Sequence, residues 1–454
     1  MGYRRGPRGM RVEDRFCMKS ICIDGFNLAL TKGSGIATYG RNLLINAQAI
    51  GLGAQVLYGP AAPYRKNPVL NEIALIDAAK VKKQPWLTRH AQIYGTRFGR
   101  TVRPIRPTGE VIWPRAAGGM PKADFFWTSR DLFRQANAAF ARHRTFTPVS
   151  FNGQGAGAAV ERAPDVMHWT APLPLAAKGV PNIYTIHDLI PLRLPHTTLD
   201  NKAAFLAQCR RIARQADHIA VVSEKTREDV IRLLDVSEDR VTNTYQSVSV
   251  PPELAERSQT DVARELEGVF GLGWKRYFLY FGAIEPKKNL GRIVEAYLAS
   301  GVDSPLVVIG GRAWLEQGET ALMTQIKASE SIVASKLLPY EYMPFAMLVS
   351  LIRGAKATLF PSLYEGFGLP VLESMALDTA VLTSTGGSLP EVAGDAALVV
   401  DPYDVPAITR GIRALDADEA LRDDLVAKGR VQAAKFSPEI YQARLRELYA
   451  KVGA

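Results

Sequence analysis

The sequence predicts an α/β protein built from two doubly wound domains that face each other across a cleft. Apolar runs of strand length alternate with amphipathic runs of helix length along most of the chain, which is typical of parallel sheets with crossover helices. A polar, proline-containing passage near residues 250–270 interrupts the pattern, and strands restart at Arg276. A chain of 454 residues also exceeds what one core usually holds, so two domains are expected.

The strand candidates form one set before this passage and a second set after it. The first set is SICIDGF, AQVLYGP, DVMHWT, NIYTIHD and HIAVVS. The second set is RYFLYFGA, PLVVIGG, KLLPYEYM, ATLFPS, AVLTST and AALVVD. Helix candidates include AAFLAQCRRIARQAD, EKTREDVIRLL, NLGRIVEAYLAS and FAMLVSLIRGA. Ligands of doubly wound sheets bind outside the carboxyl ends of the strands, so functional residues are expected there.

Two stretches depart from the alternating pattern. Residues 1–17 begin with MGYRRGPRGM, and no apolar run follows that would make this basic start a secretory signal. We expect them to form a disordered leader. Between residues 62 and 145 the alternation breaks, and we expect an insertion or an irregular cap there. The predicted domains are residues 18–255, which contain the insertion, and residues 256–435.

The insertion carries the basic character of the chain. Residues 61–145 hold 16 Lys and Arg against five Asp and Glu, a balance of +11 that equals the net charge of the whole chain. Aromatic residues are interleaved with these charges, namely Trp86, Trp113, Trp127, Tyr94, Phe98, Phe125 and Phe126. This mixture could contact an anionic membrane surface, or the aromatic side chains could pack inward. Nucleic acid is not expected as a partner, because no nucleic-acid-binding module accompanies the charge.

The remaining composition is ordinary for a globular protein, with 47% hydrophobic and 22% charged residues. Cys17, Cys22 and Cys209 show no CxxC or metal-like spacing, which indicates a reducing compartment without a disulfide framework. No run of about 18 apolar residues predicts a membrane-spanning helix. We therefore expect a cytoplasmic protein, peripheral on the inner face of the cytoplasmic membrane if the insertion binds lipid.

The stretch FPSLYEGFGLPVLESMA places Glu365 and Glu373 on either side of a glycine-rich turn between a strand and a helix that begins near Pro370. The start of such a helix presents backbone N–H groups and a positive dipole to an anion such as phosphate. Gly366 and Gly368 would let the backbone approach a ligand closely. Glu373, expected in the first helical turn, could accept hydrogen bonds from a ribose diol, and Glu365 from sugar hydroxyls. Alternatively, Glu373 only favours the helix dipole and Glu365 is solvated.

Two other strand-to-helix junctions carry candidate residues. YFGAIEPKKNLGRIVEAY has Gly282 after a strand and Lys287 and Lys288 before a helix, and a lysine in this position can neutralise a diphosphate. TIHDLIPLRLP has His187 and Asp188 directly after a strand. Asp188 would fix the tautomer of the histidine or cap a local turn. The ordinary alternatives are a solvated lysine pair and a structural histidine.

The remaining motifs are weaker. TKGSGIATYGRNLL places Gly33 and Gly35 between a strand and a helix, but it is not a full GxGxxG. The loop TSTGGSLPEVAGD, with Glu391, could face a ligand or serve packing alone. No metal site is expected, since the acidic pair in Asp416–Asp418 lies in a polar helical region far from the other motifs. Neither a P-loop lysine nor GxSxG is present.

EGFGLPVLESMA resembles the E-x7-E signature of the retaining glycosyltransferases of family four, which have the GT-B fold of two Rossmann-like domains facing a cleft. FGAIEPKKNL, HDLIPLRLP, VSEKTREDV and GDAALVVDP resemble the same family, and most closely its bacterial branch that adds mannose or related sugars to polysaccharides. The resemblance covers residues 18–60 and 160–454. It implies an acceptor domain at 18–255, a nucleotide-sugar domain at 256–435, and a final helix at 436–454 that crosses back to the first domain.

The resemblance also implies roles for single residues. Glu373 would bind the nucleotide ribose, Glu365 the hydroxyls of the donor sugar, and Lys288 the diphosphate. His187 would lie beside the transferred sugar, and Gly35 would belong to a loop over the donor. The candidate catalytic residues are thus His187, Lys288 and Glu365. The candidate donor-binding residues are Gly35, Gly282, Lys287, Phe367, Gly368, Leu369 and Glu373.

The implied activity is transfer of a sugar, with mannose from GDP-mannose as the best guess, to a polysaccharide or lipid-linked glycan. The anomeric configuration would be retained without a metal or cofactor. One departure from the family pattern is Ala283, where many members carry arginine. Lys287 or Arg292 could supply that charge. Two alternatives stay open: a sugar-nucleotide 2-epimerase on the same fold, and a non-catalytic protein that binds nucleotide sugars.

Overall fold

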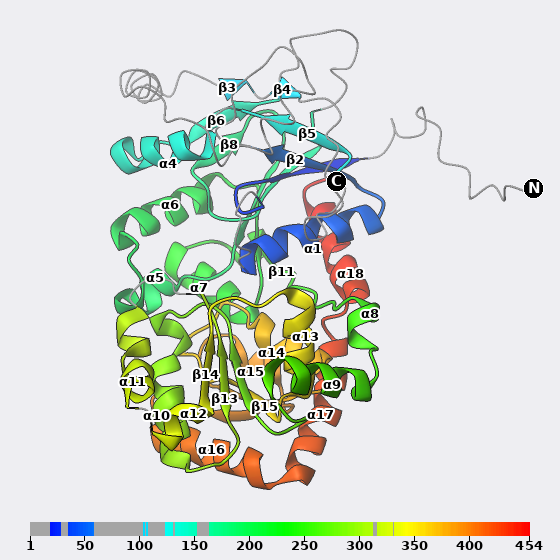
Figure 1. The fold of residues 1–454 in the computed structure, drawn as a ribbon. Coiled ribbons are helices and arrows are strands. Elements are labelled where there is room, and N and C mark those ends of the chain that lie inside the picture. Colours follow the sequence, from blue (N-terminus) through cyan, green and yellow to red (C-terminus); the bar gives the residue numbers. More distant parts are fainter. Residues whose placement is uncertain are drawn as a thin grey trace, which may run out of the picture. The chain divides into compact units, whose positions relative to one another are not determined.

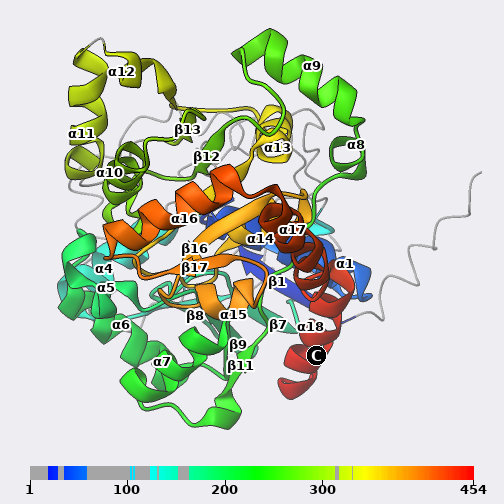
Figure 2. The same cartoon turned by 90° about the horizontal axis from the view of Figure 1, so that it is seen from below.

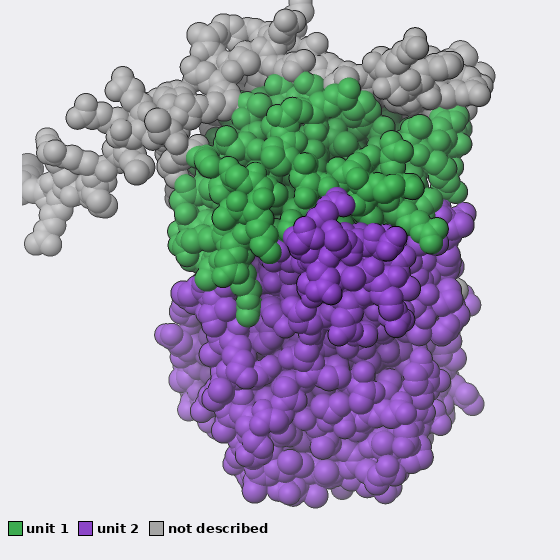
Figure 3. Space-filling model, turned by 180° about the vertical axis from the view of Figure 1, so that it is seen from behind, with its two compact units in different colours: residues 1–185, 207–220, 442–454 green, residues 186–206, 221–441 purple. Residues whose placement is uncertain are grey.

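The computed structural model describes residues 19–28, 35–58, 103–104, 106–107, 123–129, 132–151, 163–311, 316–329 and 331–454. The chain divides into two compact units, coloured separately in Figure 3. Unit 1 comprises Met1–Thr185, Ala207–Ala220 and Gln442–Ala454, and unit 2 comprises Ile186–Leu206 and Val221–Tyr441. The expected leader at residues 1–17 lies outside the described residues, and the expected boundary at 255/256 stays a prediction.

The first sheet has eight strands among the described residues, in the order β11-β10-β9-β7-β1-β2-β5-β4 (Figure 1). The strand at its centre, β1, pairs in parallel with β2 and β7. Every residue of β1, β7 and β9 is buried, as in parallel sheets covered on both faces. The strands are β1 (Ser20–Asp24), β2 (Gly53–Tyr58), β4 (Arg106–Pro107), β5 (Phe125–Thr128), β7 (Val166–Trp169), β9 (Asn182–Ile186), β10 (His218–Val221) and β11 (Val241–Asn243).

A small sheet and several helices complete this half of the described chain. The small sheet has the order β3-β6-β8, with β3 at Arg103–Pro104, β6 at Thr147–Ser150 and β8 at Leu175–Ala177. The helices are α1 (Gly35–Ala49), α4 (Leu132–His143), α5 (Ile190–Arg193), α6 (Lys202–Gln215) and α7 (Glu224–Leu234), with 3₁₀ turns η3 (Pro195–Thr197) and η4 (Glu238–Arg240).

Part of the expected insertion belongs to the first sheet. Within residues 62–145, β5 pairs in parallel with β2 and is followed by the regular helix α4. The sequence prediction was wrong here because FFWT is a short aromatic strand, and its aromatic residues were grouped with the basic patch. Trp127 is 2% exposed, and its indole N–H donates to Gln55 Oε1 at 2.6 Å. Most of the stretch, including Trp86 and Trp113, lies outside the described residues.

The last helix, α18 (Pro438–Lys451), ends among residues of unit 1. The Tyr449 hydroxyl lies 2.8 Å from His168 Nδ1, and His168 Nε2 lies 2.8 Å from Thr185 Oγ1. The Tyr39 hydroxyl of α1 also lies 2.8 Å from Thr185 Oγ1. This buried polar chain joins the carboxyl-terminal helix to two strands and a helix that are far away in the sequence. Figure 2 shows the end of α18 beside α1.

The second sheet lies in unit 2 and has six parallel strands among the described residues, in the order β14-β13-β12-β15-β16-β17. They are β12 (Phe278–Phe281), β13 (Leu306–Ile309), β14 (Leu337–Tyr340), β15 (Ala357–Phe360), β16 (Ala380–Ser384) and β17 (Leu398–Val400). Each strand candidate of the sequence, in both sets, coincides with one of the strands found. The order in unit 2 reverses between β12 and β15, and such a switch point is where doubly wound sheets bind ligands.

The helices of unit 2 pack in two groups. Helix α10 (Leu290–Ser300) packs against α11 (Glu316–Ala328) and α16 (Val405–Ala417), and Figure 2 shows α10 and α16 side by side. Helix α14 (Leu369–Ala376) packs against α17 (Glu419–Ala434), and α13 (Phe345–Gly354) packs against α9 (Gln259–Phe270). Shorter elements are α8 (Pro252–Ala255), η5 (Pro286–Lys288), α12 (Ile332–Lys336) and α15 (Leu389–Ala393). Within the described ranges, no helix has both the length and the apolar run needed to cross a membrane.

Asn289 holds three loops of unit 2 together. It is 1% exposed and has a left-handed backbone, with φ at 65°. Its side-chain Nδ2 donates to the carbonyls of Pro361 and Pro402, both at 2.8 Å. One amide group therefore connects the loops that follow β12, β15 and β17.

We predict that Asn289→Gly lowers the free energy of unfolding by about 2 to 4 kcal/mol, because two buried carbonyls lose their donor. Asn289→Ala should cost about 1 kcal/mol more, since alanine is strained in the left-handed region. Urea titration followed by fluorescence measures both. Asp235→Gly is the control, because Asp235 is exposed and has the same backbone conformation, with φ at 56°. Equal losses for Asp235→Gly and Asn289→Gly would contradict the anchoring role.

Candidate functional site

The loops that follow the neighbouring strands β12 and β15 are tied together at the carboxyl edge of the second sheet. The backbone N–H of Leu363 donates to the carbonyl of Lys287 at 2.7 Å. On its other side, the loop after β15 is held by Ser388, whose backbone N–H donates to the Glu365 carbonyl at 3.1 Å and whose hydroxyl donates to the Phe367 carbonyl at 2.7 Å. The charged side chains of both loops are therefore positioned by backbone contacts.

Lys288 and Glu365 form a buried ion pair between these loops. Lys288 Nζ lies 2.5 Å from Glu365 Oε1, and the two side chains are only 15% and 10% exposed. Burial by itself would raise the pKa of the Glu365 carboxyl, but Lys288 and then Lys287 outweigh it and hold the pKa below its ordinary value. Glu365 is therefore a carboxylate throughout the physiological range, and the solvated-loop alternative is wrong.

Lys287 is the second cation of the cluster. Its Nζ lies 3.3 Å from Glu285 Oε1. Burial by itself would lower the pKa of Lys287, but the carboxylates of Glu365, Asp188 and Glu285 outweigh it and raise the pKa. The other candidate to replace the missing arginine, Arg292, is used differently: its Nη1 donates to Asn289 Oδ1 at 2.9 Å, and its guanidinium lies over the ring of Tyr403.

The start of α14 offers unpaired backbone donors next to this cluster. Gly368 precedes the helix with φ at +110°, a conformation that glycine adopts without strain. Among the described residues, no acceptor pairs with the backbone N–H groups of Phe367, Gly368 and Leu369. The Phe367 ring packs against the rings of Tyr245 and Phe436. These three N–H groups and the helix dipole favour a bound anion.

Glu373 does not lie in the first turn of α14, as the sequence predicted. The helix begins at Leu369, which makes Glu373 its fifth residue and places it in the second turn. The helix start was predicted at the right place, but a turn holds only 3.6 residues, and the fifth residue lies just beyond it. Glu373 therefore gains little from the helix dipole, which acts mainly within the first turn.

The Glu373 carboxyl is half-buried and has no hydrogen-bond or ion-pair partner among the described residues. Burial raises its pKa to about 7. An unpaired, partly desolvated carboxyl of this kind costs stability unless a ligand hydrogen-bonds to it. This contrasts with Glu365, whose charge two lysines compensate.

His187 follows β9 and lies against the Glu365 loop within unit 2. A Cβ added to Gly366 would lie 2.3 Å from the His187 carbonyl oxygen and 2.9 Å from Asp188 Cβ. Gly366 therefore serves the contact with His187, and the expectation that it lets the backbone approach a ligand was wrong. Asp188 caps the local turn, because its Oδ1 accepts a hydrogen bond from the Ile190 N–H at 3.0 Å.

The two remaining predicted glycines lie in different units. Gly282 directly follows β12 with φ at +139°, and its N–H donates to the Ile309 carbonyl at 2.9 Å. Gly35 is the first residue of α1 in unit 1, where an added Cβ would meet nothing within 4 Å. Residues 29–34, which contain Gly33, lie outside the described residues.

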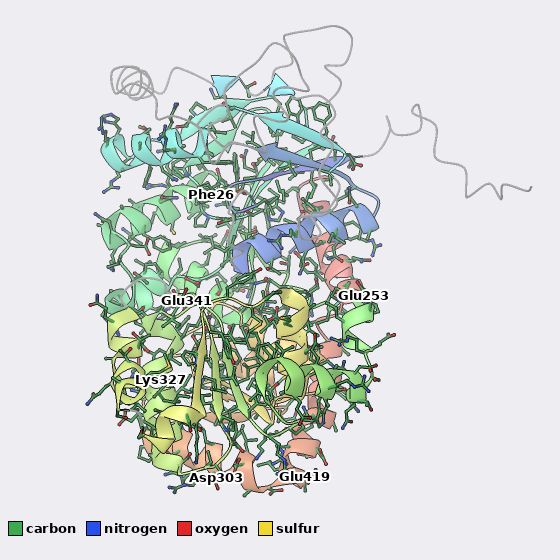
Figure 4. The ribbon with its side chains drawn as sticks, in the orientation of Figure 1. Phe26, Glu253, Asp303, Lys327, Glu341 and Glu419 are labelled. Atoms are coloured by element: carbon green, nitrogen blue, oxygen red, sulfur yellow. The ribbon has the colours of Figure 1, made fainter. Side chains whose placement is uncertain are left out.

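A cavity of about 390 Å³ opens at the same edge of the second sheet. Ile284, Gly310 and Glu341 come from the loops that follow the strands, and Met323 and Lys327 from α11. Figure 4 labels Lys327 and Glu341, which reach this cavity from different elements. Its volume is within the range of small-molecule sites.

The sequence indicates no role for Glu285 or Asp229, and it leaves the role of Glu391 open. Glu285 is 4% exposed, and its Oε2 has no hydrogen-bond partner among the described residues. Asp229 of α7 binds both Arg193 and Tyr364. Glu391 caps α7 by accepting from the backbone N–H of Glu224 at 3.1 Å, so packing explains it. All three depend on contacts between segments that only folding brings together.

Metal ligands do not gather in the part of the chain that the structure describes, since no group of three or more His, Cys, Asp or Glu side chains could hold an ion there. Cys22 and Cys209 are buried. The described site offers a ligand two lysine side chains, a set of backbone N–H donors and two carboxyl groups whose pKa values are shifted in opposite directions.

Comparison with known proteins identifies the family. The family description Glycosyl transferases group 1 matches residues 270–432, and Glycosyltransferase Family 4 matches residues 131–249. The O-antigen chain mannosyltransferase B of Escherichia coli is 32% identical over 262 residues, which cover 57% of this chain and 67% of the relative. The serotype-specific mannosyltransferase WbdA of Escherichia coli is 31% identical over 274 residues, which cover 58% of this chain and 33% of the relative, so this chain spans about a third of that protein's length.

The fold is shared with solved glycosyltransferase structures. Sucrose-phosphate synthase from Thermosynechococcus elongatus superposes with a TM-score of 0.62 at 17% identity, over 95% of this chain and 98% of that one. The glycosyltransferase WaaG, described as involved in lipopolysaccharide biosynthesis, superposes with a TM-score of 0.56 at 13% identity, over 96% of this chain and all of that one (100%). Together with the two parallel sheets, these matches show that the chain belongs to the glycosyltransferases of group 1, family four, and has their GT-B fold.

Proposed function

We propose that this protein transfers a sugar from a nucleotide diphosphate donor to a hydroxyl of a glycan acceptor, with retention at the anomeric carbon. The observation that carries the proposal is the meeting of Lys287, Lys288 and Glu365 beside the unpaired backbone N–H groups at the start of α14.

The diphosphate is assigned to the cationic part of this arrangement. Two lysine ammonium groups and the N–H groups of Phe367, Gly368 and Leu369 are donors only, as phosphate oxygens require. Lys287 supplies the positive charge that arginine supplies in many relatives. Lys287 interacts electrostatically with Glu365, whereas the guanidinium of Arg292 is hydrogen-bonded to Asn289. Gly282 leaves room for the donor at the end of β12.

The two glutamates are assigned to different parts of the donor. Glu373 is a free acceptor and fits the two neighbouring hydroxyls of a ribose. Glu365 keeps its charge through Lys288 and accepts from the hydroxyls of the donor sugar with its remaining lone pairs. His187, across Gly366 from Glu365, is assigned to the transferred sugar. Gly35, the first residue of α1, is assigned to donor binding.

The chemical step is departure of the nucleoside diphosphate through an oxocarbenium-like state. Negative charge develops on the leaving diphosphate, and Lys288 with the start of α14 stabilises it in place. The acceptor hydroxyl attacks the same face, which gives retention. We propose that neither a metal nor a cofactor takes part, because cationic side chains and backbone N–H groups supply the electrostatic stabilisation.

The relatives' names support a more specific donor and acceptor. The two similar Escherichia coli proteins are named as mannosyltransferases, one of them of an O-antigen chain. We therefore propose mannose from GDP-mannose, transferred to a polysaccharide or lipid-linked glycan of the cell surface. We place the protein in the cytoplasm, peripheral on the inner face of the cytoplasmic membrane.

The activity and the role of Lys288 are tested together. With a panel of nucleotide sugars and glycan acceptors, followed by mass spectrometry, the protein should consume GDP-mannose and extend the acceptor. Lys288→Ala should lower turnover by about 10²- to 10³-fold, the usual cost of losing one such stabiliser, and Glu365→Ala should behave alike. Lys428→Ala, which removes an exposed lysine paired with Asp424, is the control.

Removing Lys288 alone leaves a buried carboxylate with less compensation, so folding must be checked. The double variant Lys288→Gln with Glu365→Gln removes both charges and should remain folded and inactive. Near-normal turnover in any folded variant lacking Lys288 would contradict its role. Conversion of the donor to an epimer without acceptor would favour the epimerase, and binding without consumption would favour a binding protein.

Glu373→Gln should separate stability from binding. The folded protein keeps its proton up to about pH 7, whereas an ordinary glutamate releases it near 4.5, so stability of the unliganded protein falls as pH rises between these values. Glutamine abolishes this dependence and should raise the melting temperature relative to the parent at pH 8. GDP affinity, measured by calorimetry, should fall about tenfold or more, because a charged acceptor is lost. Unchanged GDP affinity would argue against a ribose contact.

The membrane contact of the basic stretch is tested with lipid vesicles. Its excess of +11 charges within residues 61–145 should bind vesicles that contain phosphatidylglycerol and not vesicles of phosphatidylcholine alone. Binding should weaken at high salt, because salt screens exposed charges. Co-sedimentation that is independent of both the lipid charge and the salt concentration would rule out the membrane contact.

A further inference from the structure

We propose that Asp229 is a positioning residue for the transfer reaction: it joins the segment that carries His187 to the loop that carries Glu365. The inference rests on the proposed function and concerns residues that neither the sequence motifs nor the proposed donor contacts include. All of them belong to unit 2. The link is built from side chains of α5, α7 and the loop after β15.

The carboxylate of Asp229 binds one group from each segment. The side chain is 1% exposed, and Arg193 donates to it twice, with Nε at 3.0 Å from Oδ2 and Nη2 bound to Oδ1. The Tyr364 hydroxyl donates to the same Oδ2 at 2.6 Å. Arg193 lies six positions after His187, and Tyr364 directly precedes Glu365. One buried carboxylate thus spans the two segments.

Thr226, three residues before Asp229 on α7, forms a second joint. Its Oγ1 lies 3.1 Å from the His187 carbonyl and 3.4 Å from the Gly366 carbonyl, and it can donate to one of them at a time. Helix α7 therefore contacts the residues on both sides of Glu365, namely Tyr364 and Gly366. The missing side chain of Gly366 allows His187 to come this close.

The charge states support a permanent link. The hydrogen bond to Asp229 is the main cause that raises the pKa of the Arg193 guanidinium. Burial first, and then Asp229, raises the pKa of the Tyr364 phenol, so the phenol keeps its proton and remains a donor. Because Arg193 alone balances the charge of Asp229, loss of the Tyr364 hydroxyl leaves no unpaired charge behind. Tyr364→Phe is thus a mild way to cut the link.

Cutting the link should affect chemistry more than binding. Catalysis by positioned groups is sensitive to displacements of about 1 Å, which can cost about 10²-fold in rate. The proposed nucleotide contacts, Glu373 and the N–H groups of α14, do not touch Tyr364. A purely structural role would instead lower stability and leave the turnover of the folded enzyme unchanged.

The experiment compares two tyrosine variants in the full chain. Tyr364→Phe should lower kcat about tenfold or more while the Kd for GDP stays within about twofold. Tyr277→Phe is the matched control, because the Tyr277 hydroxyl also makes a buried hydrogen bond of 2.6 Å, to the Leu351 carbonyl, away from the site. The control should lower the melting temperature without changing kcat. An unchanged kcat for Tyr364→Phe, or equal effects on kcat and GDP affinity, overturns the proposal.

Two further measurements keep the test decisive. In combination with Asp229→Asn, Tyr364→Phe should add little further loss of kcat, because both changes break one link. Hydrogen exchange needs no activity: Tyr364→Phe should speed exchange in residues 361–368, and unchanged exchange there overturns the link. A parent protein that consumes no donor, with exchange altered as expected, shows instead that the proposed function is wrong and the link is real.

Discussion

The ion pair between Lys288 and Glu365 is the contact on which the rest of the site depends. A buried carboxylate lowers the free energy of unfolding unless cations and hydrogen bonds compensate its charge. The loops after β12 and β15 must therefore keep their positions relative to each other. Asn289 and the backbone contact between Leu363 and Lys287 hold them there. The sheet contributes the switch point, because β12 and β15 are neighbours whose following loops meet at one edge.

Burial acts in opposite directions on the two glutamates of the E-x7-E stretch, because their partners differ. Glu365 faces two lysines, and its pKa is lowered despite burial. Glu373 faces none, and burial raises its pKa to about 7. The protein keeps the first charged, and among the described residues it gives the second no partner. The sequence spacing places Glu365 on a loop and Glu373 on a helix. The charge states of the two carboxyl groups differ because their neighbouring residues differ.

Much of the fold could be read from the sequence, because parallel strands buried on both faces are continuous apolar runs. The short strand β5 could not, since a run of three aromatic residues between polar ones also suits a surface patch. Glu373 was assigned to the first turn although the helix start was predicted correctly, because the fifth residue of a helix lies just beyond a turn of 3.6 residues. Gly366 was attributed to a ligand, since a glycine does not show in the sequence which group comes close to it.

The sequence by itself determined the class of the fold and the family, because both depend on local periodicity and on motifs with fixed spacing. Only the tertiary structure decided that Lys287 rather than Arg292 joins the cluster, that Asp188 caps a turn, and that Asp229 joins Arg193 to Tyr364. These outcomes depend on which side chains meet across segments far apart in the chain, and on how burial and neighbouring charges compete there.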